Sequence, residues 1–333
     1  MIFVDNEQVT DPRVNLALEE YLLRHLDTEE DILLFYINEP SIIIGRNQNT
    51  LEEINYEYVC EHGIHVVRRM SGGGTVYHDL GNLNFSFITE YAPGNFRNFR
   101  KFTRPVIEVL HELGVPAELS GRNDILVEGR KISGTAQYST SKRMFSHGTL
   151  LFNAQLDNVS AALNVKMSKI ISKGIKSVRS RVANISEFMT EQMTTEAFRQ
   201  RLLEGIFAGA ASIPQYHLTE TDWAGVHQLV EERYDRWEWN YGRSPGFNVQ
   251  RTQRFPFGEI DARIDVQQGR IEGVKFYGDF LGNGDMADME AALTGVRYDT
   301  EALAAALAGI DVNDYFGGIT LEEFVWFLHD KCD

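Results

Sequence analysis

The sequence has little cysteine and no long apolar run. Only two cysteines occur among its 333 residues, Cys60 and Cys332, and we interpret both as ordinary reduced thiols rather than as a disulfide framework. No stretch approaches the roughly 18 consecutive apolar residues that a membrane-spanning helix needs. The opening MIFVDNEQVTDPR lacks the basic region, apolar core and cleavage site of a signal peptide. These absences predict a cytoplasmic protein.

Positive charge is also scarce, because 32 lysines and arginines face 48 acidic residues and the formal net charge is −16. Proteins that bind nucleic-acid backbones normally carry a positive surface, so we expect no nucleic-acid partner. One acid-free segment between Asp157 and Glu187 is an exception, with Lys166, Lys169, Lys173, Lys176, Arg179 and Arg181. It is either a solvated helix face or a binding site for a phosphate-bearing ligand.

Several kinds of catalytic centre find no support in the sequence. No cysteine or histidine pair has zinc-ligand spacing, and no Ser-His-Asp or Cys-His order accompanies a strained turn. The composition is that of a globular protein, with 43% hydrophobic residues, and the length suits one large domain plus a small one, or two medium domains.

The order of predicted elements indicates an α+β fold. Asp11-Pro12 opens a helix, strands are expected at 32–37 and 41–45, a helix runs from Asn49 or Thr50 to Gly63, and a strand follows at 64–68. Further predicted elements are strands at 75–79, 83–90 and 147–153, a helix at 98–113, a hairpin at 124–137, and mainly helical structure over 157–235.

The tryptophan-rich segment 237–248 has the glycine and proline content of a linker. Beyond it we expect a hairpin over 262–278 and three helices. The predicted domains are therefore 1–240, a linker at 241–250, and a small domain at 251–333.

The strongest chemical motif is the glycine cluster in RRMSGGGTVYHD, residues 68–79. Successive glycines let the backbone approach a ligand, and their N–H groups can cup an anion. The cluster fits neither the P-loop nor the dinucleotide fingerprint. It indicates an anion site but no reaction.

A second motif places Asn123 and Asp124 before a hairpin that carries Lys131 and Gly134. A lysine on such a strand could extend into a cleft, and Asp124 could bind Mg²⁺. From spacing alone, a surface lysine is the favoured interpretation. The sequence alone is likewise compatible with a purely structural role for His78 and His147.

Taken in order, these motifs resemble the lipoate–protein ligase family over nearly the whole length. The matching blocks are NLALEEYLL, SIIIGRNQN, RRMSGGGTVYHDLGNLNFSF, GRNDILVEGRKISGTAQ, SHGTLLFN, KGIKSVRSRVANI and WEWNYGRSPGF. The resemblance implies a biotin/lipoate ligase-like domain, with a mixed, mostly antiparallel sheet flanked by helices. A small α+β accessory domain would follow it.

The resemblance also implies an activity: MgATP converts lipoate to lipoyl-AMP, and a lysine of an acceptor then takes the lipoyl group. The implied acceptors are apo lipoyl domains of 2-oxoacid dehydrogenase E2 subunits and the glycine-cleavage H protein.

By the same match, Lys131 is the expected catalytic residue and contacts both substrates. The expected nucleotide contacts are Arg69, Gly74, Thr75, Val76, Tyr77, Asn123, Lys173, Val178 and Arg179. The expected lipoate contacts are Ser71, Gly72, Gly73, His78, Gly134 and His147. Asp124 is the expected Mg²⁺ ligand. Met70 departs from the small polar residue expected in the motif, which affects only pocket shape.

Two other functions compete with this one. An octanoyl or lipoyl acyltransferase, or amidotransferase, of the same fold would need no ATP, and some use a cysteine nucleophile. Neither Cys60 nor Cys332 falls in a site motif. A non-catalytic protein that binds lipoate or docks lipoyl domains would not need Lys131 together with Arg69 and Asp124. A biotin ligase would carry a different glycine-rich signature.

Overall fold

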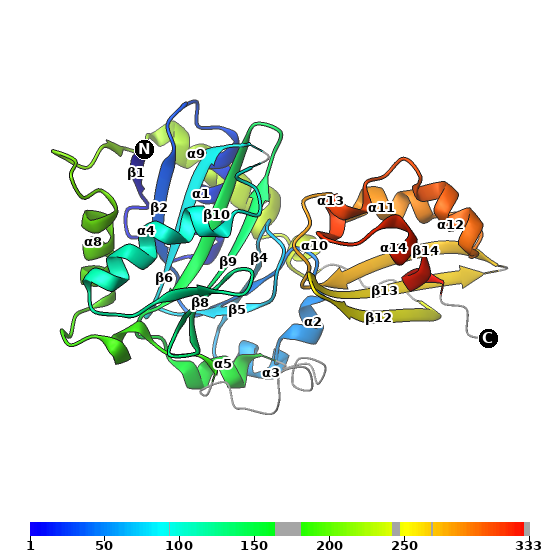
Figure 1. The fold of residues 1–333 in the computed structure, drawn as a ribbon, viewed down its shortest axis with the longest axis horizontal. Coiled ribbons are helices and arrows are strands. Elements are labelled where there is room, and N and C mark those ends of the chain that lie inside the picture. Colours follow the sequence, from blue (N-terminus) through cyan, green and yellow to red (C-terminus); the bar gives the residue numbers. More distant parts are fainter. Residues whose placement is uncertain (93, 164–180, 242–246, 268, 330–333) are drawn as a thin grey trace. The chain divides into compact units, whose positions relative to one another are not determined.

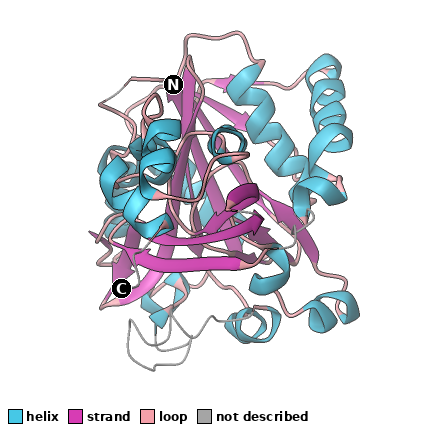
Figure 2. Ribbon diagram, turned by 90° about the vertical axis from the view of Figure 1, so that its right-hand side faces the viewer, coloured by secondary structure: helices cyan, strands magenta, loops and turns pink. Residues whose placement is uncertain are grey.

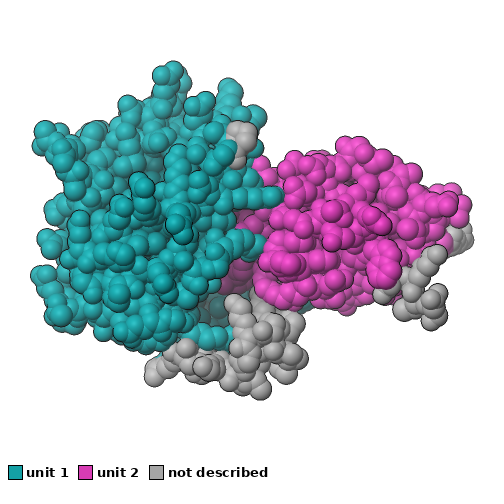
Figure 3. Space-filling model, in the orientation of Figure 1, with its two compact units in different colours: residues 1–43, 51–68, 76–240 teal, residues 44–50, 69–75, 241–333 magenta. Residues whose placement is uncertain are grey.

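The computed structural model describes residues 1–92, 94–163, 181–241, 247–267 and 269–329 (Figure 1). The chain divides into two compact units, coloured separately in Figure 3. The first unit comprises residues 1–43, 51–68 and 76–240, and the second comprises residues 44–50, 69–75 and 241–333. The second unit therefore includes two short loops from the N-terminal part of the sequence, one of which holds the glycine cluster.

The first unit is built on an eight-stranded sheet in which only β1 pairs parallel to its neighbours. The strand order is β11 (Gln215–Tyr216), β1 (Ile2–Asp5), β2 (Ile32–Ile37), β6 (Asn82–Glu90), β10 (Arg143–Leu151), β9 (Arg130–Ser139), β8 (Asp124–Val127) and β7 (Glu118–Ser120). The predicted mixed, mostly antiparallel sheet is thus confirmed. A smaller sheet has the order β4 (His65–Arg68), β3 (Ser41–Ile44) and β5 (Val76–His78).

Helices cover both faces of the large sheet. Alternate residues of its strands, such as Phe85 and Phe87, form a core with the apolar faces of α4 (Phe99–Glu112) and α8 (Thr195–Ile206). Because neighbouring residues of a strand point to opposite faces, Ser86 and His147 lie on the other side. There α1 (Pro12–Arg24) packs against β6 and β10, and α9 (Glu220–Leu229) packs against α1.

The start of α1 follows the expected chemistry. The Asp11 side chain accepts a hydrogen bond from the Arg13 N–H, and Pro12 occupies the first helical position, where no N–H is needed. Pro105 lies inside α4.

The helix expected from Asn49 or Thr50 to Gly63 is wrong in one respect, because two short helices occur there. They are α2 (Thr50–Glu53) and α3 (Tyr56–Glu61). Asn55 separates them, since its side chain caps α3 by accepting from the Tyr58 N–H. In the described part of 157–235 the structure is mainly helical, as predicted, with α5 (Leu156–Ala162), α8, α9, a 3-10 turn at Ile185–Phe188 and a π-helical turn at Val230–Tyr234.

The second unit contains a three-stranded antiparallel sheet packed on helices (Figure 2). The strands are β12 (Val249–Phe255), β13 (Gly258–Gln267) and β14 (Arg270–Gly278), and the helices are α11 (Met286–Leu293), α12 (Thr300–Leu307), α13 (Val312–Phe316) and α14 (Leu321–Leu328). The predicted hairpin at 262–278 is confirmed. Strand β12 was not predicted and begins inside the segment assigned to the linker, and a fourth helix adds to the three expected. The helix α10 (Trp237–Asn240) ends the first unit. In the described residues, no helix has the length and apolar character to cross a membrane.

Candidate active site

Lys131 lies on β9 beside Asp124 of β8, and its Nζ is 2.7 Å from the Asp124 Oδ1. A β-bulge produces this arrangement. Leu126 pairs with Lys131 and Ile125 pairs with Ser133, so Ile132 has no opposite residue on β8. The extra residue changes the alternation of side chains along β9. Lys131 therefore shares a face with Gly134, three residues away, whereas Ile132 is buried in the core.

Gly134 leaves the space that the lysine side chain occupies. A Cβ atom at this position would lie 2.9 Å from the Lys131 Nζ and 3.1 Å from its Cε. Asn123 fixes the start of β8, since its carbonyl accepts from the Thr135 N–H and its Nδ2 donates to the Thr135 carbonyl at 2.5 Å. The structure therefore brings Asn123, Asp124, Lys131 and Gly134 together.

Asp124 is the residue whose chemistry fits a metal ion. Its side chain is 32% exposed and already faces the cation of Lys131. In the described ranges, no group of three or more His, Cys, Asp or Glu side chains could hold a metal unaided. A single carboxylate nevertheless suits Mg²⁺, which keeps waters and takes its other ligands from phosphate oxygens. The residues fit a magnesium ion that arrives with a nucleotide.

His147 lies on β10 opposite Ala136 of β9. Its Nδ1 is 2.9 Å from a carboxylate oxygen of Glu19 on α1, and both side chains are buried. A carboxylate accepts hydrogen bonds, so the His147 Nδ1 carries the proton and the ring orientation is fixed. The Lys131 Nζ lies over Gly134, and Gly134 is two residues from Ala136, so both positions are on one face of β9. His147 and the end of the Lys131 side chain therefore lie on the same face of the sheet.

Sequence reasoning missed Glu19. The signal was present, because Glu19 and Glu20 stand together in the apolar helix pattern NLALEEYLL, where two adjacent acids need buried partners. Glu20 accepts hydrogen bonds from the Tyr234 hydroxyl and from Arg24.

Val76, Tyr77 and His78 form strand β5, which pairs with β3. Burial raises the pKa of the Tyr77 phenol, and the charge of Asp79 acts in the same direction. His78 is buried, and its Nδ1 lies 3.0 Å from the Nδ2 of Asn38, at the end of β2.

The glycine cluster belongs to the second unit and is held by Arg69. The buried guanidinium of Arg69 donates to the Gly72 carbonyl at 2.7 Å, to the Gly74 carbonyl at 2.9 Å and to the Ser71 hydroxyl at 3.0 Å. Through these three hydrogen bonds the loop folds around the Arg69 guanidinium. Gly73 has a φ of +96°, a conformation that favours glycine.

The loop at 44–50 supports the glycine cluster. The Arg69 N–H donates to the Ile44 carbonyl and the Arg46 N–H donates to the Ser71 carbonyl. Gln48 ties the two loops together, because its Oε1 accepts from the Gly45 N–H and from the Thr75 hydroxyl, each at 2.9 Å. Gln48 is a second residue that sequence reasoning did not single out, although it stands in the matched block SIIIGRNQN.

The glycine cluster also contacts residues just after β14. The Gly73 N–H donates to the Phe280 carbonyl at 3.3 Å, and the Gly278 N–H donates to the Asn47 carbonyl at 2.7 Å. An ion pair of 3.2 Å joins Arg46 to Asp285. The backbone bond of Gly73 and the bond from the Arg69 guanidinium to the Gly72 carbonyl therefore fix the positions of these glycines within this unit.

Three predicted nucleotide contacts, Lys173, Val178 and Arg179, lie outside the described residues. The chain that follows them returns to the site, because the Ala183 N–H donates to the Lys131 carbonyl at 3.0 Å.

Comparisons with known proteins identify the family. A family model described as lipoyl protein ligase A/B catalytic domain matches residues 11–207, and one described as bacterial lipoate protein ligase C-terminus matches residues 244–328. The lipoate-protein ligase LplJ of Bacillus subtilis is 58% identical over 331 residues, which cover 99% of this chain and 100% of that protein.

Solved structures agree with this match. A bi-partite lipoate protein ligase of Thermoplasma acidophilum, described with its E2 lipoyl domain, is 30% identical with a TM-score of 0.64, covering 74% of this chain and 98% of its own. A lipoate-protein ligase A bound with ATP is 29% identical with a TM-score of 0.60, covering 73% and 97%. The chain described here belongs to the lipoate–protein ligase family.

Proposed function

We propose that this protein activates free lipoate with MgATP and transfers the lipoyl group to a lysine of an apo lipoyl domain. The observation that supports this most directly is the cation of Lys131, which a β-bulge and Gly134 place beside Asp124 on the face of the sheet that carries His147. Family membership supplies the reaction, and the ATP-bound relative supports the nucleotide.

In the first step, a carboxylate oxygen of lipoate attacks the α-phosphorus of ATP. The bond from that phosphorus to the bridging oxygen of the β-phosphate breaks, giving lipoyl-AMP and pyrophosphate. Two anions must approach each other, so a positive group between them lowers the barrier in a site of low dielectric. Lys131 supplies that charge, and Gly134 lets its Nζ reach the reacting atoms.

The predicted contacts divide into two groups. Arg69, Gly74, Thr75, Val76, Tyr77 and Asn123 would contact the nucleotide, together with Lys173, Val178 and Arg179. Ser71, Gly72, Gly73, Gly134, His78 and His147 would contact lipoate. The ordered backbone around Arg69 supports a role of the glycine cluster in ligand binding, because a pre-organised loop binds a ligand at a lower entropy cost.

Mg²⁺ would be held by Asp124 together with oxygens of the triphosphate. Bound there, the ion would neutralise charge that develops on the leaving pyrophosphate. The role of Lys131 would differ from that of the ion, because the lysine would contact the lipoate carboxylate and the α-phosphate.

In the second step, the neutral amine of an acceptor lysine attacks the acyl carbon of lipoyl-AMP. The bond to AMP breaks, AMP leaves, and the new amide nitrogen loses a proton. We propose lipoyl domains of 2-oxoacid dehydrogenase E2 subunits and glycine-cleavage H protein as acceptors. The relative described with its E2 lipoyl domain supports the first of these. We also propose that the protein acts in the cytoplasm, where ATP is available.

We further propose that residues 1–240 perform the adenylation and that the accessory domain at 251–333 is needed for the full cycle. A truncation after about residue 245 tests this division. Full activity of the truncated protein in both half-reactions would contradict it.

The first experiment is the intact mass of an apo lipoyl domain after incubation with the protein, MgATP and free lipoate. We expect a gain equal to one lipoyl group that requires ATP. Lys131→Ala should reduce the rate by at least about 100-fold, while alanine at the exposed Lys142 should leave it unchanged. Modification that occurs only with an acylated carrier protein, and without ATP, would establish the acyltransferase instead.

A further inference from the structure

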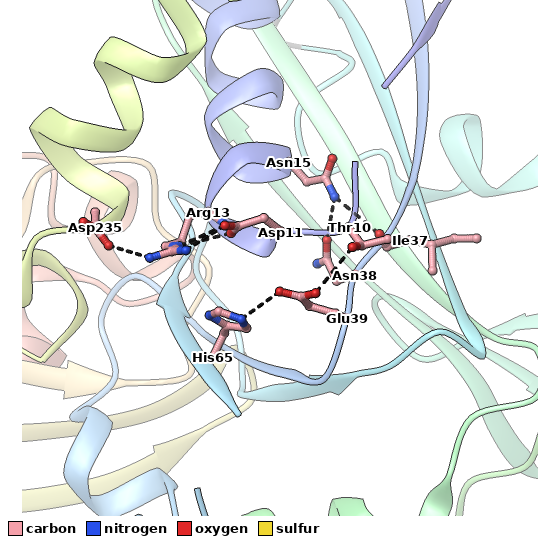
Figure 4. Close-up of polar contacts among 9 residues, drawn as sticks. All are labelled: Thr10, Asp11, Arg13, Asn15, Ile37, Asn38, Glu39, His65 and Asp235. Carbon is pink, nitrogen blue, oxygen red and sulfur yellow. Dashed lines mark hydrogen bonds and ion pairs between the residues drawn. The ribbon is translucent and has the colours of Figure 1, made fainter. Parts of the chain in front are cut away.

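Three buried asparagines form a hydrogen-bonded chain that ends on His78. The Asn6 Nδ2 donates to the Asn15 Oδ1 at 2.9 Å, and the Asn15 Nδ2 donates to the Asn38 Oδ1 at 2.9 Å. The Asn38 Nδ2 then lies 3.0 Å from the His78 Nδ1. All four side chains are at most 3% exposed. The Asn15–Asn38 contact, with the adjacent bond from Asn15 to the Ile37 carbonyl, is drawn in Figure 4.

The direction of this chain is set at its far end by the carbonyl of Val9. That oxygen accepts from the Asn6 Nδ2 at 2.8 Å and from the Asn15 Nδ2 at 2.9 Å. A carbonyl oxygen cannot donate, so rotating either amide by 180° would place two oxygens in contact. The amide groups of Asn6 and Asn15 are therefore fixed in orientation.

The orientation of Asn38 follows from that of Asn15. The Asn15 Nδ2 donates toward Asn38, so the atom that faces it must be the Oδ1. The other atom of that amide, Nδ2, faces the His78 ring and can only donate. The His78 Nδ1 must accept, which a ring nitrogen does only without a proton. His78 is thus a neutral imidazole whose proton is on Nε2.

The second histidine predicted for the lipoate site has the opposite arrangement. The His147 Nδ1 donates to the carboxylate of Glu19, so its proton lies on the nitrogen that His78 leaves bare. Two imidazoles near one substrate are thus set to different hydrogen-bonding patterns by different partners, an amide for His78 and a carboxylate for His147.

We propose that Asn38, supported by Asn15 and Asn6, is a positioning residue that fixes His78 as an Nε2–H donor toward the bound acyl substrate. The inference rests on the proposed function, because it takes His78 as part of the lipoate site. In this arrangement His78 offers a hydrogen bond to an acceptor atom, such as a carboxylate or carbonyl oxygen. It cannot remove a proton through Nδ1.

The decisive readout is the protonation pattern of the His78 ring in the full-length protein labelled with ¹⁵N-histidine. Long-range ¹H–¹⁵N correlation spectra distinguish protonated from unprotonated ring nitrogens, and the His78→Gln spectrum assigns the signal. We expect an unprotonated Nδ1 and a protonated Nε2 in the wild-type protein. A protonated Nδ1 there would overturn the proposal without any variant.

Asn38→Asp then tests whether Asn38 sets the pattern. A carboxylate of the same shape can still accept from Asn15 but cannot donate, so Nδ1 should gain a proton. The kcat/KM for lipoate should fall about tenfold or more while the KM for ATP stays within about twofold. As the spectroscopic control, Asn82→Asp places a carboxylate at another buried asparagine of the same unit, where Asn84 and not a histidine is the partner. It should leave the His78 pattern unchanged.

An unchanged ring pattern in Asn38→Asp, or an inverted pattern with unchanged kcat/KM for lipoate, would overturn the proposal. If Asn38→Asp does not fold, the wild-type spectrum and Asn38→Ala, which removes the donor without adding charge, decide the case. Failure of the proposed function is recognised separately, as wild-type protein that releases no pyrophosphate in response to lipoate. The spectra do not depend on that result.

Discussion

Gly134 and Lys131 compete for one small volume, since a methyl group at residue 134 would lie 2.9 Å from the lysine Nζ. Only the flexible end of the lysine would have to move. We therefore expect Gly134→Ala to leave the free energy of unfolding within about 1 kcal/mol of the wild type. The adenylation rate should fall by about 10- to 100-fold, because a shift of about 1 Å in a catalytic group is costly.

The matched control for this variant is Gly273→Ala. Gly273 also lies in a strand, and an added Cβ there meets no atom within 4 Å. Pyrophosphate release and chemical denaturation measure the two quantities. A Gly134→Ala protein with wild-type turnover would show that the lysine need not occupy this place.

Asp124→Asn separates metal binding from stability. The Asp124–Lys131 ion pair is about one-third exposed on each side, and such pairs contribute about 0.2–1 kcal/mol. Folding should therefore be little affected, whereas the Mg²⁺ concentration for half-maximal pyrophosphate release should rise about tenfold. A titration with Mg²⁺ at saturating ATP and lipoate measures it, with Asn at the exposed Asp27 as control. An unchanged requirement would remove Asp124 from the metal site.

The glycines of the cluster should differ in their tolerance of alanine. A Cβ at Gly72 would lie 2.3 Å from the backbone oxygen of Phe280, whereas a Cβ at Gly74 would meet no atom within 4 Å. Gly72→Ala should lower the free energy of unfolding of the second unit by about 1–3 kcal/mol, as overpacking does. Gly74→Ala should fold normally and raise the KM for ATP.

Thermal unfolding and steady-state kinetics of the two cluster variants provide the comparison. Equal thermal stability of the variants would contradict the contact with Phe280. An unchanged KM for ATP in Gly74→Ala would instead argue against the nucleotide contact predicted for that residue.

Asp222 should give the protein an acid-sensitive contribution to stability. Its carboxylate accepts hydrogen bonds from the Thr219 N–H and hydroxyl and from the hydroxyls of Tyr21 and Tyr216. Burial raises the pKa of Asp222, but these bonds together outweigh burial and lower it below 3.8. The contribution is present in full above the unfolded-state pKa and is lost as the pH falls through the folded-state pKa.

Asp222→Asn should therefore cost about 1–3 kcal/mol at neutral pH and flatten the decline in stability on acidification. Burial and the neighbouring Asp222 raise the pKa of Tyr21 to about 12. The contribution of Tyr21 to stability is therefore present below its unfolded-state pKa, near 10, and is lost as the pH rises through its folded-state pKa. Denaturation across the pH range, with Tyr21→Phe as the comparison, measures both limbs. Parallel curves for wild type and Asp222→Asn below pH 4 would contradict this assignment.

Much of the fold could be predicted from local sequence patterns, and the predictions that were wrong have local causes. The hairpin of β8 and β9 was predictable because apolar and β-branched residues lie on both sides of a short polar turn, which the structure places at Glu128 and Gly129. The helix boundary at Asn55 was not predictable from the sequence. An asparagine inside a helical pattern can either remain in the helix or cap a new one with its side chain, and the local sequence does not distinguish the two cases.

The candidate site also has a part that the sequence predicted and a part that it did not. Residue types and the family resemblance pointed to Lys131, Asp124 and the glycine cluster. The partnership of Glu19 with His147, and that of Gly72 with Phe280, join residues far apart in sequence, and no short-range pattern encodes them.

The bulge at Ile132 makes the length of β9 as important as its composition. Because side chains alternate along a strand, regular pairing of these same residues without the bulge would place Lys131 and Gly134, three residues apart, on opposite faces and turn Lys131 toward the apolar core. A cation there would face Ile125 and Val127 rather than substrate. Between Lys131 and Gly134, changes that remove the bulge should therefore be tolerated less than substitutions that keep it, a constraint that would appear in related sequences as a fixed spacing of these two residues.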